Sequence, residues 1–387
     1  MTTSLGSFPH TSGARAVLTS PQRPGRPCAG RQPTPVSGGS VTAVVRDPIP
    51  LPVRSGGRGG TSPHQSPARS GGGRPPAAGA ASLALRPLLD PPRRAARVIA
   101  VFPSALYVEM RGGPEPRVLA VVASDAHRLP NSVVVAATRR EQPFRSVREG
   151  ADAWVGDGRV EAGPLHVRVR RWWDPAPVLG TMRPAALGHG VRTLEAAFAA
   201  AGMTGGGLSG HPDPDVLAAC CAAGDLAGAV EAAERIVGLG PGLTPSGDDI
   251  LCGLLVSLRL VGGAVRHGRT GLGWGDDPSH SPVRSAHKAV WLADWLGAAV
   301  TADAGTRTTA LAATLLHCAA AGGAGAEVAA VLRCVAGHEP PGAAVRRLLA
   351  VGHTSGTDLA HGVLAGCRAA LALVSPVVVQ DAPRVTA

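Results

Sequence analysis

The sequence predicts an α+β protein: a small N-terminal β barrel or sandwich, then an all-helical domain, with a disordered tail in front. Short β-branched runs separated by Gly and Pro fill residues 95–182, a pattern typical of an all-β unit. Within residues 190–376 the apolar residues recur at helical spacing instead. Residues 1–90 are rich in Pro, Gly, Ser and Arg, a composition that cannot bury enough apolar surface to form a core.

The predicted tail holds most of the positive charge. The 387 residues carry a net charge of +11, and residues 1–90 contain ten arginines against Asp47 and Asp90. Lys288 is the only lysine among 38 basic residues, which indicates a compositional bias rather than phosphate recognition. Aromatic residues make up only 3% of the chain, so few rings can stack on bases. We therefore expect no binding to nucleic acid.

Cysteine usage and hydropathy predict a cytoplasmic protein. None of the seven cysteines forms a CxxC pair, and most lie in apolar helical patterns, as expected in a reducing compartment. The N-terminus lacks the compact apolar stretch of a secretory signal. No uninterrupted apolar run reaches membrane-spanning length, because Arg259 interrupts 250–263, and Arg368 and Pro376 interrupt 363–379. We therefore expect no membrane association.

Five strands are expected in the β unit. Four are short β-branched runs, and the fifth alternates apolar and polar residues, so one of its faces should be buried. Their expected ranges are 97–102, 105–110, 117–122, 132–137 and 165–170. His127 and His166 stand alone in this part of the sequence, and most isolated histidines have structural roles.

The helical domain should contain nine helices. Their expected ranges are 191–202, 212–223, 225–237, 248–265, 283–300, 306–321, 325–336, 341–350 and 356–374. Loops are expected at 205–210 and 271–281. The second loop contains Asp276, Asp277 and His280, which could ligate a metal, although a solvated loop is the simpler interpretation.

The most distinctive stretch is GLGPGLTPSGDD at 238–249. Ser246, with Asp249 three residues later, predicts a helix that begins with a Ser N-cap. A glycine loop leading into a helix N-terminus suits an anion, because free N–H groups and the helix dipole point the same way. Asp248 and Asp249 would repel a bare phosphate. They suggest a bound cation such as magnesium, an amide or a hydroxyl instead.

The same pattern recurs near the C-terminus, within GHTSGTD at 352–358. Both copies read Ser-Gly-x-Asp-(Ile/Leu)-x-x-Gly-x-Leu, with Gly253 and Gly362 one turn after the Asp. Small residues at these positions permit two helices to cross closely. We predict that the helices cross there and bring Ser246 and Ser355 to one site, with Cα atoms within roughly 15 Å. The alternative is that both motifs are independent helix caps.

Three stretches together resemble one known family: GLGPGLTPSGDD, GHTSGTD, and the Arg-Thr-Thr stretch at 307–309. This is the AllH-like family, formerly a domain of unknown function, and a member is a subunit of oxamate carbamoyltransferase in allantoin catabolism. The resemblance covers roughly residues 97–375. The chain departs from the family at Ala312, where the family often carries Ser.

The resemblance implies a part in the phosphorolysis of oxalurate to oxamate and carbamoyl phosphate, a step of purine degradation, or in the reaction of a related ureido substrate. It implies a small anionic carbamoyl or ureido substrate, a CoA-ligase-like partner and a second subunit. The sequence shows no Ser-His-Asp arrangement typical of a catalytic triad, and Cys252 lies in an apolar pattern. Catalysis would therefore rest on positioning and electrostatics. The alternative is a non-catalytic scaffold or regulatory ligand-binding subunit whose motifs only cap helices.

The candidate site residues come from the two motifs and the Arg-Thr-Thr stretch. Catalytic groups are expected at Asp248, Asp249, His353 and Asp358. Substrate-binding groups are expected at Gly240, Gly242, Thr244, Ser246, Gly247, Arg307, Thr308, Thr354, Ser355 and Gly356. Glycine N–H groups and Arg307 could hold an anion, although Arg307 could equally be a surface arginine. The carboxylates could bind an amide N–H or a magnesium ion.

Overall fold

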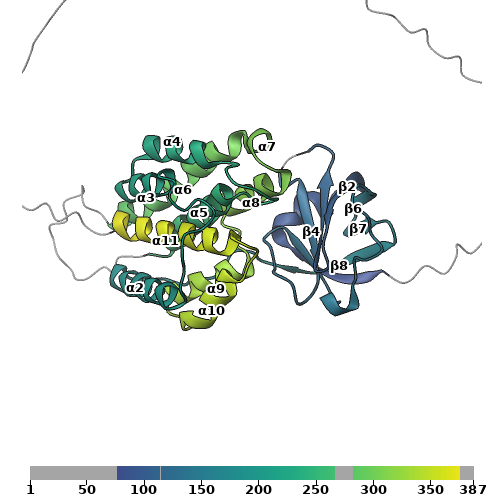
Figure 1. The fold of residues 1–387 in the computed structure, drawn as a ribbon, viewed down its shortest axis with the longest axis horizontal. Coiled ribbons are helices and arrows are strands. Elements are labelled where there is room, and N and C mark those ends of the chain that lie inside the picture. The colour runs from purple at the N-terminus through teal and green to yellow at the C-terminus, as the bar shows by residue number, and fades with distance from the viewer. Residues whose placement is uncertain (1–75, 114, 266–281, 375–387) are drawn as a thin grey trace, which may run out of the picture. The chain divides into compact units, whose positions relative to one another are not determined.

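The computed structural model describes residues 76–113, 115–265 and 282–374, all of which belong to one compact unit. Residues 1–75 of the predicted tail lie outside the described residues, and so does the loop with Asp276, Asp277 and His280. Strands dominate up to residue 173 and helices follow, as Figure 1 shows. The α+β class and the order of its two parts are therefore confirmed.

Eight strands close into a barrel. They are β1 (Ala77–Ser82), β2 (Arg94–Val101), β3 (Ala105–Met110), β4 (Val118–Val122), β5 (Ser132–Val135), β6 (Asp152–Gly156), β7 (Arg159–Ala162) and β8 (Leu165–Trp173). Their spatial order is β1-β5-β4-β3-β2-β6-β7-β8. β1 closes the barrel, because it pairs antiparallel with β5 on one side and parallel with β8 on the other.

β1 corrects the predicted boundaries of the tail at residue 90 and of the β unit at residue 95. Residues 77–89 form β1, a 3-10 helix η1 (Leu83–Leu85) and the short helix α1 (Arg86–Leu89). The sequence of β1, AAGAAS, lacks the β-branched residues that mark a strand. Small residues are required there, because a Cβ at Gly79 would lie 2.8 Å from Val167. β6 and β7 were also missed, since both are short.

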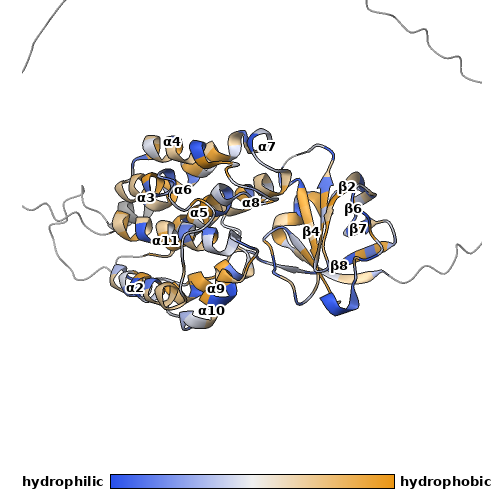
Figure 2. Cartoon of the chain, viewed as in Figure 1, coloured by the Kyte–Doolittle hydropathy of each residue, from blue (hydrophilic) through white to orange (hydrophobic). Residues whose placement is uncertain are grey.

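β4 connects the barrel to the helical part. All five of its residues are buried, and Figure 2 shows it as an apolar strand. Alternate residues enter the barrel core, while Ala120 and Val122 pack on the other face against Leu129. The backbone N–H of Val118 donates to the hydroxyl of Thr314 at 3.1 Å. A strand buried on both faces is thus explained by helix packing on its outer side.

Ten helices follow the barrel in the described residues. They are α2 (Pro184–Ala200), α3 (Asp213–Ala223), α4 (Leu226–Ile236), α5 (Ser246–Ala264), α6 (Pro282–Ala302), α7 (Ala304–Arg307), α8 (Ala310–Ala320), α9 (Ala326–Val335), α10 (Pro341–Leu349) and α11 (Ser355–Val374). The helix expected at 306–321 is two helices, α7 and α8. The break occurs because Thr308 is extended, with φ −135° and ψ −176°.

α5 and α11 form the centre of the helical part and lie side by side in Figure 1. A Cβ at Gly253 would lie 2.3 Å from the Leu359 carbonyl oxygen, and one at Gly362 would lie 2.0 Å from that of Ile250. Only hydrogen at these positions permits such backbone contact. The predicted crossing at these two glycines is therefore confirmed.

α11 is also the one helix in the described part of the chain that is long and apolar enough to cross a bilayer. Its residues Ala360, Val363, Cys367 and Ala370 are fully buried in the helical core. This is the environment expected of the central helix of a globular fold.

Thr309 fixes the glycine loop to the start of α8. Its hydroxyl accepts from the Ala312 N–H at 3.0 Å and donates to the Leu243 carbonyl at 2.6 Å. Thr309→Ala should lower the free energy of unfolding by about 1 kcal/mol, because it removes an N-cap. Thr306→Ala is the matched control, since Thr306 is exposed and bonds only to the Asp303 carbonyl. Urea denaturation should show the larger loss for Thr309→Ala, and equal losses would contradict the capping role.

Candidate functional site

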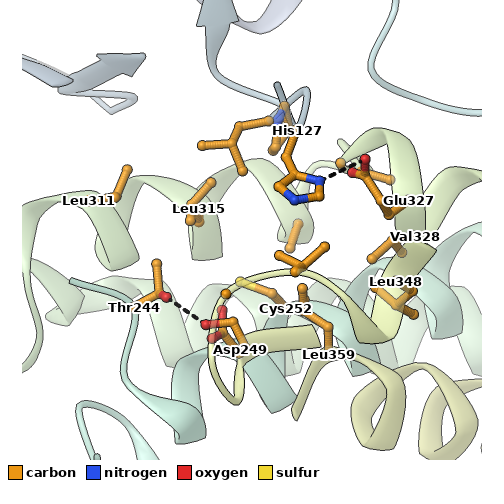
Figure 3. A pocket seen from close by; sticks show the side chains of 18 of the residues that line it. His127, Thr244, Asp249, Cys252, Leu311, Leu315, Glu327, Val328, Leu348 and Leu359 are labelled. Carbon is orange, nitrogen blue, oxygen red and sulfur yellow. Dashed lines mark hydrogen bonds and ion pairs between the residues drawn. The ribbon is translucent and has the colours of Figure 1, made fainter. Parts of the chain in front are cut away.

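A cavity of about 270 Å³ lies where the N-terminal ends of α5 and α11 meet. Thr244, Asp249, Gly352 and Ser355 line it from the two motifs. Figure 3 shows Thr244 and Asp249 side by side, with Leu311 and Leu315 of α8 beyond them and His127 of the barrel opposite. The Thr244 and Ser355 hydroxyls are 3.2 Å apart. Both motifs therefore reach one cavity through these residues, whereas Ser246 does not line it.

Asp249 is the buried titratable group of this cavity. Its side chain hydrogen-bonds to the Ser355 and Thr244 hydroxyls, while its Oδ2 has no protein partner. Burial raises the pKa of Asp249 to about 8, with smaller upward contributions from the Asp358 and Asp248 carboxyls that the two hydroxyls oppose. The carboxyl is therefore largely neutral at pH 7. In that form it donates a hydrogen bond and does not repel an anion.

Asp248 faces a different set of partners and does not line the cavity. Its Oδ1 accepts from the Gly238 N–H at 3.0 Å, and its Oδ2 accepts from the Thr308 hydroxyl. Burial raises the pKa of Asp248, and these two bonds and the Arg307 charge oppose that shift. Both oxygens are thus occupied in holding the glycine loop. Asp248 and Thr308 thus position this loop, and their predicted catalytic and substrate-binding roles stay predictions.

Asp358 is fully buried near the start of α11. Its Oδ1 accepts from the Gly207 N–H at 3.0 Å, and its Oδ2 has no protein partner. The loop is pressed against it so closely that a Cβ at Gly206 would lie 1.9 Å from Oδ1. A Cβ at Gly207 would lie 2.1 Å from the Ser246 hydroxyl and 3.5 Å from that of Thr354. This region borders a second pocket, so Asp358 and Asp249 do not share one cavity.

The predicted Ser N-cap of α5 is wrong. Pro245 is the N-cap residue and has no side-chain capping bond, while Ser246 is the first helical residue and is buried. The glycines that follow each Ser are required for packing. A Cβ at Gly247 would lie 1.8 Å from the Ile236 carbonyl, and one at Gly356 would lie 2.1 Å from that of Leu348. These two glycines therefore permit close packing at the start of each helix, and their predicted contact with a ligand stays a prediction.

The remaining predicted residues lie away from the cavity. Arg307 donates to the Glu234 carbonyl and lies 3.7 Å from Asp303, so it is not an anion clamp in this structure. His353 is exposed. Gly240 and Gly242 have positive φ values of 121° and 96° and turn the exposed loop. None of these residues lines the cavity.

Two further chemistries find little support in the cavity wall. Burial raises the pKa of the Cys252 thiol well above its ordinary value, so this cysteine is a poor nucleophile. Among the described residues, no group of three or more His, Cys, Asp or Glu side chains could hold a metal ion. The donor set at Asp249 is one carboxyl and two hydroxyls, and the predicted magnesium ion stays a prediction.

Sequence reasoning missed three parts of this region. His127 stands alone in the sequence, yet its Nδ1 lies 3.0 Å from the Glu327 carboxylate at the cavity edge. The sequence predicts only a loop at 205–210, yet Gly205–Gly207 covers Asp358 and Ser246. Part of the apolar wall comes from α8, α9 and α10, which carry no motif. The three consecutive glycines were the one available signal, since such a run permits close approach to a neighbour.

Comparison with known proteins bears on the same stretch. The family model described as oxamate carbamoyltransferase subunit AllH matches residues 236–367. The resemblance to the AllH family is thereby confirmed. The AllH match covers about a third of the chain, narrower than the predicted 97–375, and includes both motifs. No curated protein and no solved structure matches the chain. AllH is described there as a subunit.

Proposed function

We propose that this chain is a subunit of an oxamate carbamoyltransferase-type complex, and that its cavity holds the carbamoyl or ureido end of a small substrate. The observation that carries the proposal is the Asp249 carboxyl, buried at the cavity wall with a free Oδ2 and two hydroxyls beside it. The AllH match over the same residues supplies the reaction class. A CoA-ligase-like partner and a second subunit stay predictions.

The reaction requires a proton at the leaving nitrogen. In the phosphorolysis of oxalurate, a phosphate oxygen bonds to the carbamoyl carbon while the bond from that carbon to the oxamate nitrogen breaks. The nitrogen leaves readily only when it takes up a proton. The neutral Asp249 carboxyl can donate that proton, because a pKa of about 8 lies near the working pH. The attacking hydrogen phosphate loses its own proton, which restores the carboxyl.

The hydroxyls of Thr244 and Ser355 would orient the acid. They come from the two motifs and lie 3.2 Å apart, so the α5–α11 crossing sets their position. Each bonds to the Asp249 side chain and leaves Oδ2 without a protein partner. A preoriented donor of this kind contributes through positioning, as expected where no nucleophile is present.

Asp249→Asn tests the proposal. Asn keeps the shape of the side chain and can donate a hydrogen bond but cannot transfer a proton. Carbamoyl phosphate formation by the reconstituted complex should therefore fall by about 10²–10⁴-fold. Asp213→Asn is the matched control, because Asp213 is also buried but pairs with Arg235 at 2.7 Å outside the cavity. It should lose stability and keep turnover. Wild-type turnover in Asp249→Asn would exclude the acid role.

The alternative function is a regulatory subunit whose cavity binds a ligand without catalysis. It predicts that Asp249→Asn alters ligand affinity while a partner's turnover at saturating ligand stays unchanged. A purely capping role is disfavoured, since Pro245 is the N-cap of α5 and Asp249 faces the cavity. We also propose a cytoplasmic location, which the free state of the six cysteines in the described residues supports.

A further inference from the structure

Much of the cavity wall is apolar. Aliphatic side chains from five helices line it together with residues of the barrel, while Thr244, Asp249 and Ser355 form one polar group and the His127–Glu327 pair forms another. The aliphatic residues are Val256, Leu311, Leu315, Val328, Leu348 and Leu359. Oxamate and carbamoyl phosphate are small and polar throughout, so neither would use these walls. The lining therefore points to a ligand with two unlike ends.

The cavity also lacks a fixed positive charge. No Lys or Arg is found among the described residues that line it. Arg307 is engaged with Glu234 and Asp303, and Arg117 donates to the Glu115 carboxylate at 2.6 Å. A doubly charged phosphate in an apolar cavity without a paired cation would lose its hydration without compensation. This chain on its own is therefore poorly suited to hold carbamoyl phosphate.

We propose that the cavity binds a ureido or carboxamide compound that carries an apolar substituent, and that any phosphate co-substrate is held outside this chain. This inference rests on the proposed function. The ureido group lies against the Asp249 carboxyl, beside the Thr244 and Ser355 hydroxyls. The substituent lies along Leu311, Leu315 and Val328. A volume of about 270 Å³ is at the small end of ligand pockets, which fits a substituent of a few carbons.

Calorimetry on the full-length chain with an alkylurea series tests the inference. The probes are methylurea, propylurea and pentylurea, with oxamate and carbamoyl phosphate as polar comparisons. Burial of one CH₂ group contributes about 0.8 kcal/mol, so the Kd should fall about fourfold per added methylene until the cavity is full. Oxamate and carbamoyl phosphate should bind more weakly than pentylurea.

Leu315→Trp should abolish the gain in affinity with increasing alkyl length of the urea, because the larger ring fills the apolar end of the cavity. Leu315 is half-buried, so the substitution is tolerable for folding. Leu226→Trp is the matched control, since Leu226 is a half-buried leucine on α4 that does not line the cavity. The control should keep the wild-type dependence on chain length.

The result that overturns the inference is a Kd independent of chain length, or carbamoyl phosphate binding more tightly than every alkylurea. Absence of binding by all three alkylureas overturns it as well. These outcomes differ from failure of the proposed function, which is read from the turnover of Asp249→Asn in the complex. Loss of turnover in that variant together with a flat alkylurea series would keep the acid role and reject the apolar substituent.

Discussion

Gly253→Ala should lower the free energy of unfolding by about 3 kcal/mol or more, whereas Gly263→Ala in the same helix should raise it slightly. The new Cβ of Gly253→Ala would lie 2.3 Å from the Leu359 carbonyl oxygen, so backbone must move apart. Gly263 is exposed, and a Cβ added there would come no closer than 3.7 Å to its nearest neighbour, the Val290 side chain. Alanine there gains about 0.5–1 kcal/mol, because glycine weakens a helix interior.

The two variants carry the same substitution in α5, so they separate helix propensity from helix crossing. Urea denaturation followed by circular dichroism gives both free energies. The crossing also sets the distance between Thr244 and Ser355, so a Gly253→Ala protein that still folds should bind ligand more weakly at the cavity. Equal stability changes at the two positions would contradict the close backbone contact of α5 and α11.

The crossing of α5 and α11 could be predicted because the glycines that permit it lie within the two motifs themselves. Each motif places a glycine one turn after its Asp, at Gly253 and Gly362, and no other residue type permits contact of two helix backbones. The helices themselves follow from apolar periodicity. By contrast, β1 is built from Ala and Gly, which fit beside Val133 and Val167 but have no intrinsic strand preference.

The division of roles among the carboxyls could not be predicted. Asp248 and Asp249 are adjacent in sequence, and the sequence offers no reason to separate them. Helix geometry turns adjacent side chains about 100° apart, so one meets Thr308 and the Gly238 N–H and the other faces the cavity. The partners that decide their charge lie on distant segments. The apolar walls have the same origin, because α8, α9 and α10 come together only in the fold.

The stability of the protein should fall as pH rises from about 4 to about 8, and Asp249→Asn should reduce that fall. The folded pKa of Asp249, about 8, lies above its ordinary value of 3.8. In this window the folded state holds a proton that the unfolded state releases. The contribution of Asp249 to the free energy of unfolding is therefore fully present below about pH 4. It is lost as the pH rises through about 8. At about 1.4 kcal/mol per pH unit over about four units, the total is roughly 6 kcal/mol.

Asn cannot titrate, so the variant should be more stable than the wild type at pH 8. Asp248, whose pKa burial also raises, is present in both proteins and cancels in the difference. Asp125→Asn is the control, because the Arg139 backbone N–H lowers the pKa of this exposed carboxyl and places its titration below the window. Free energies of unfolding at pH 5, 6, 7, 8 and 9 give the comparison. If the wild type and Asp249→Asn run parallel from pH 5 to 8, Asp249 is ionised in the fold. It could then not donate the proton on which the proposed chemistry depends.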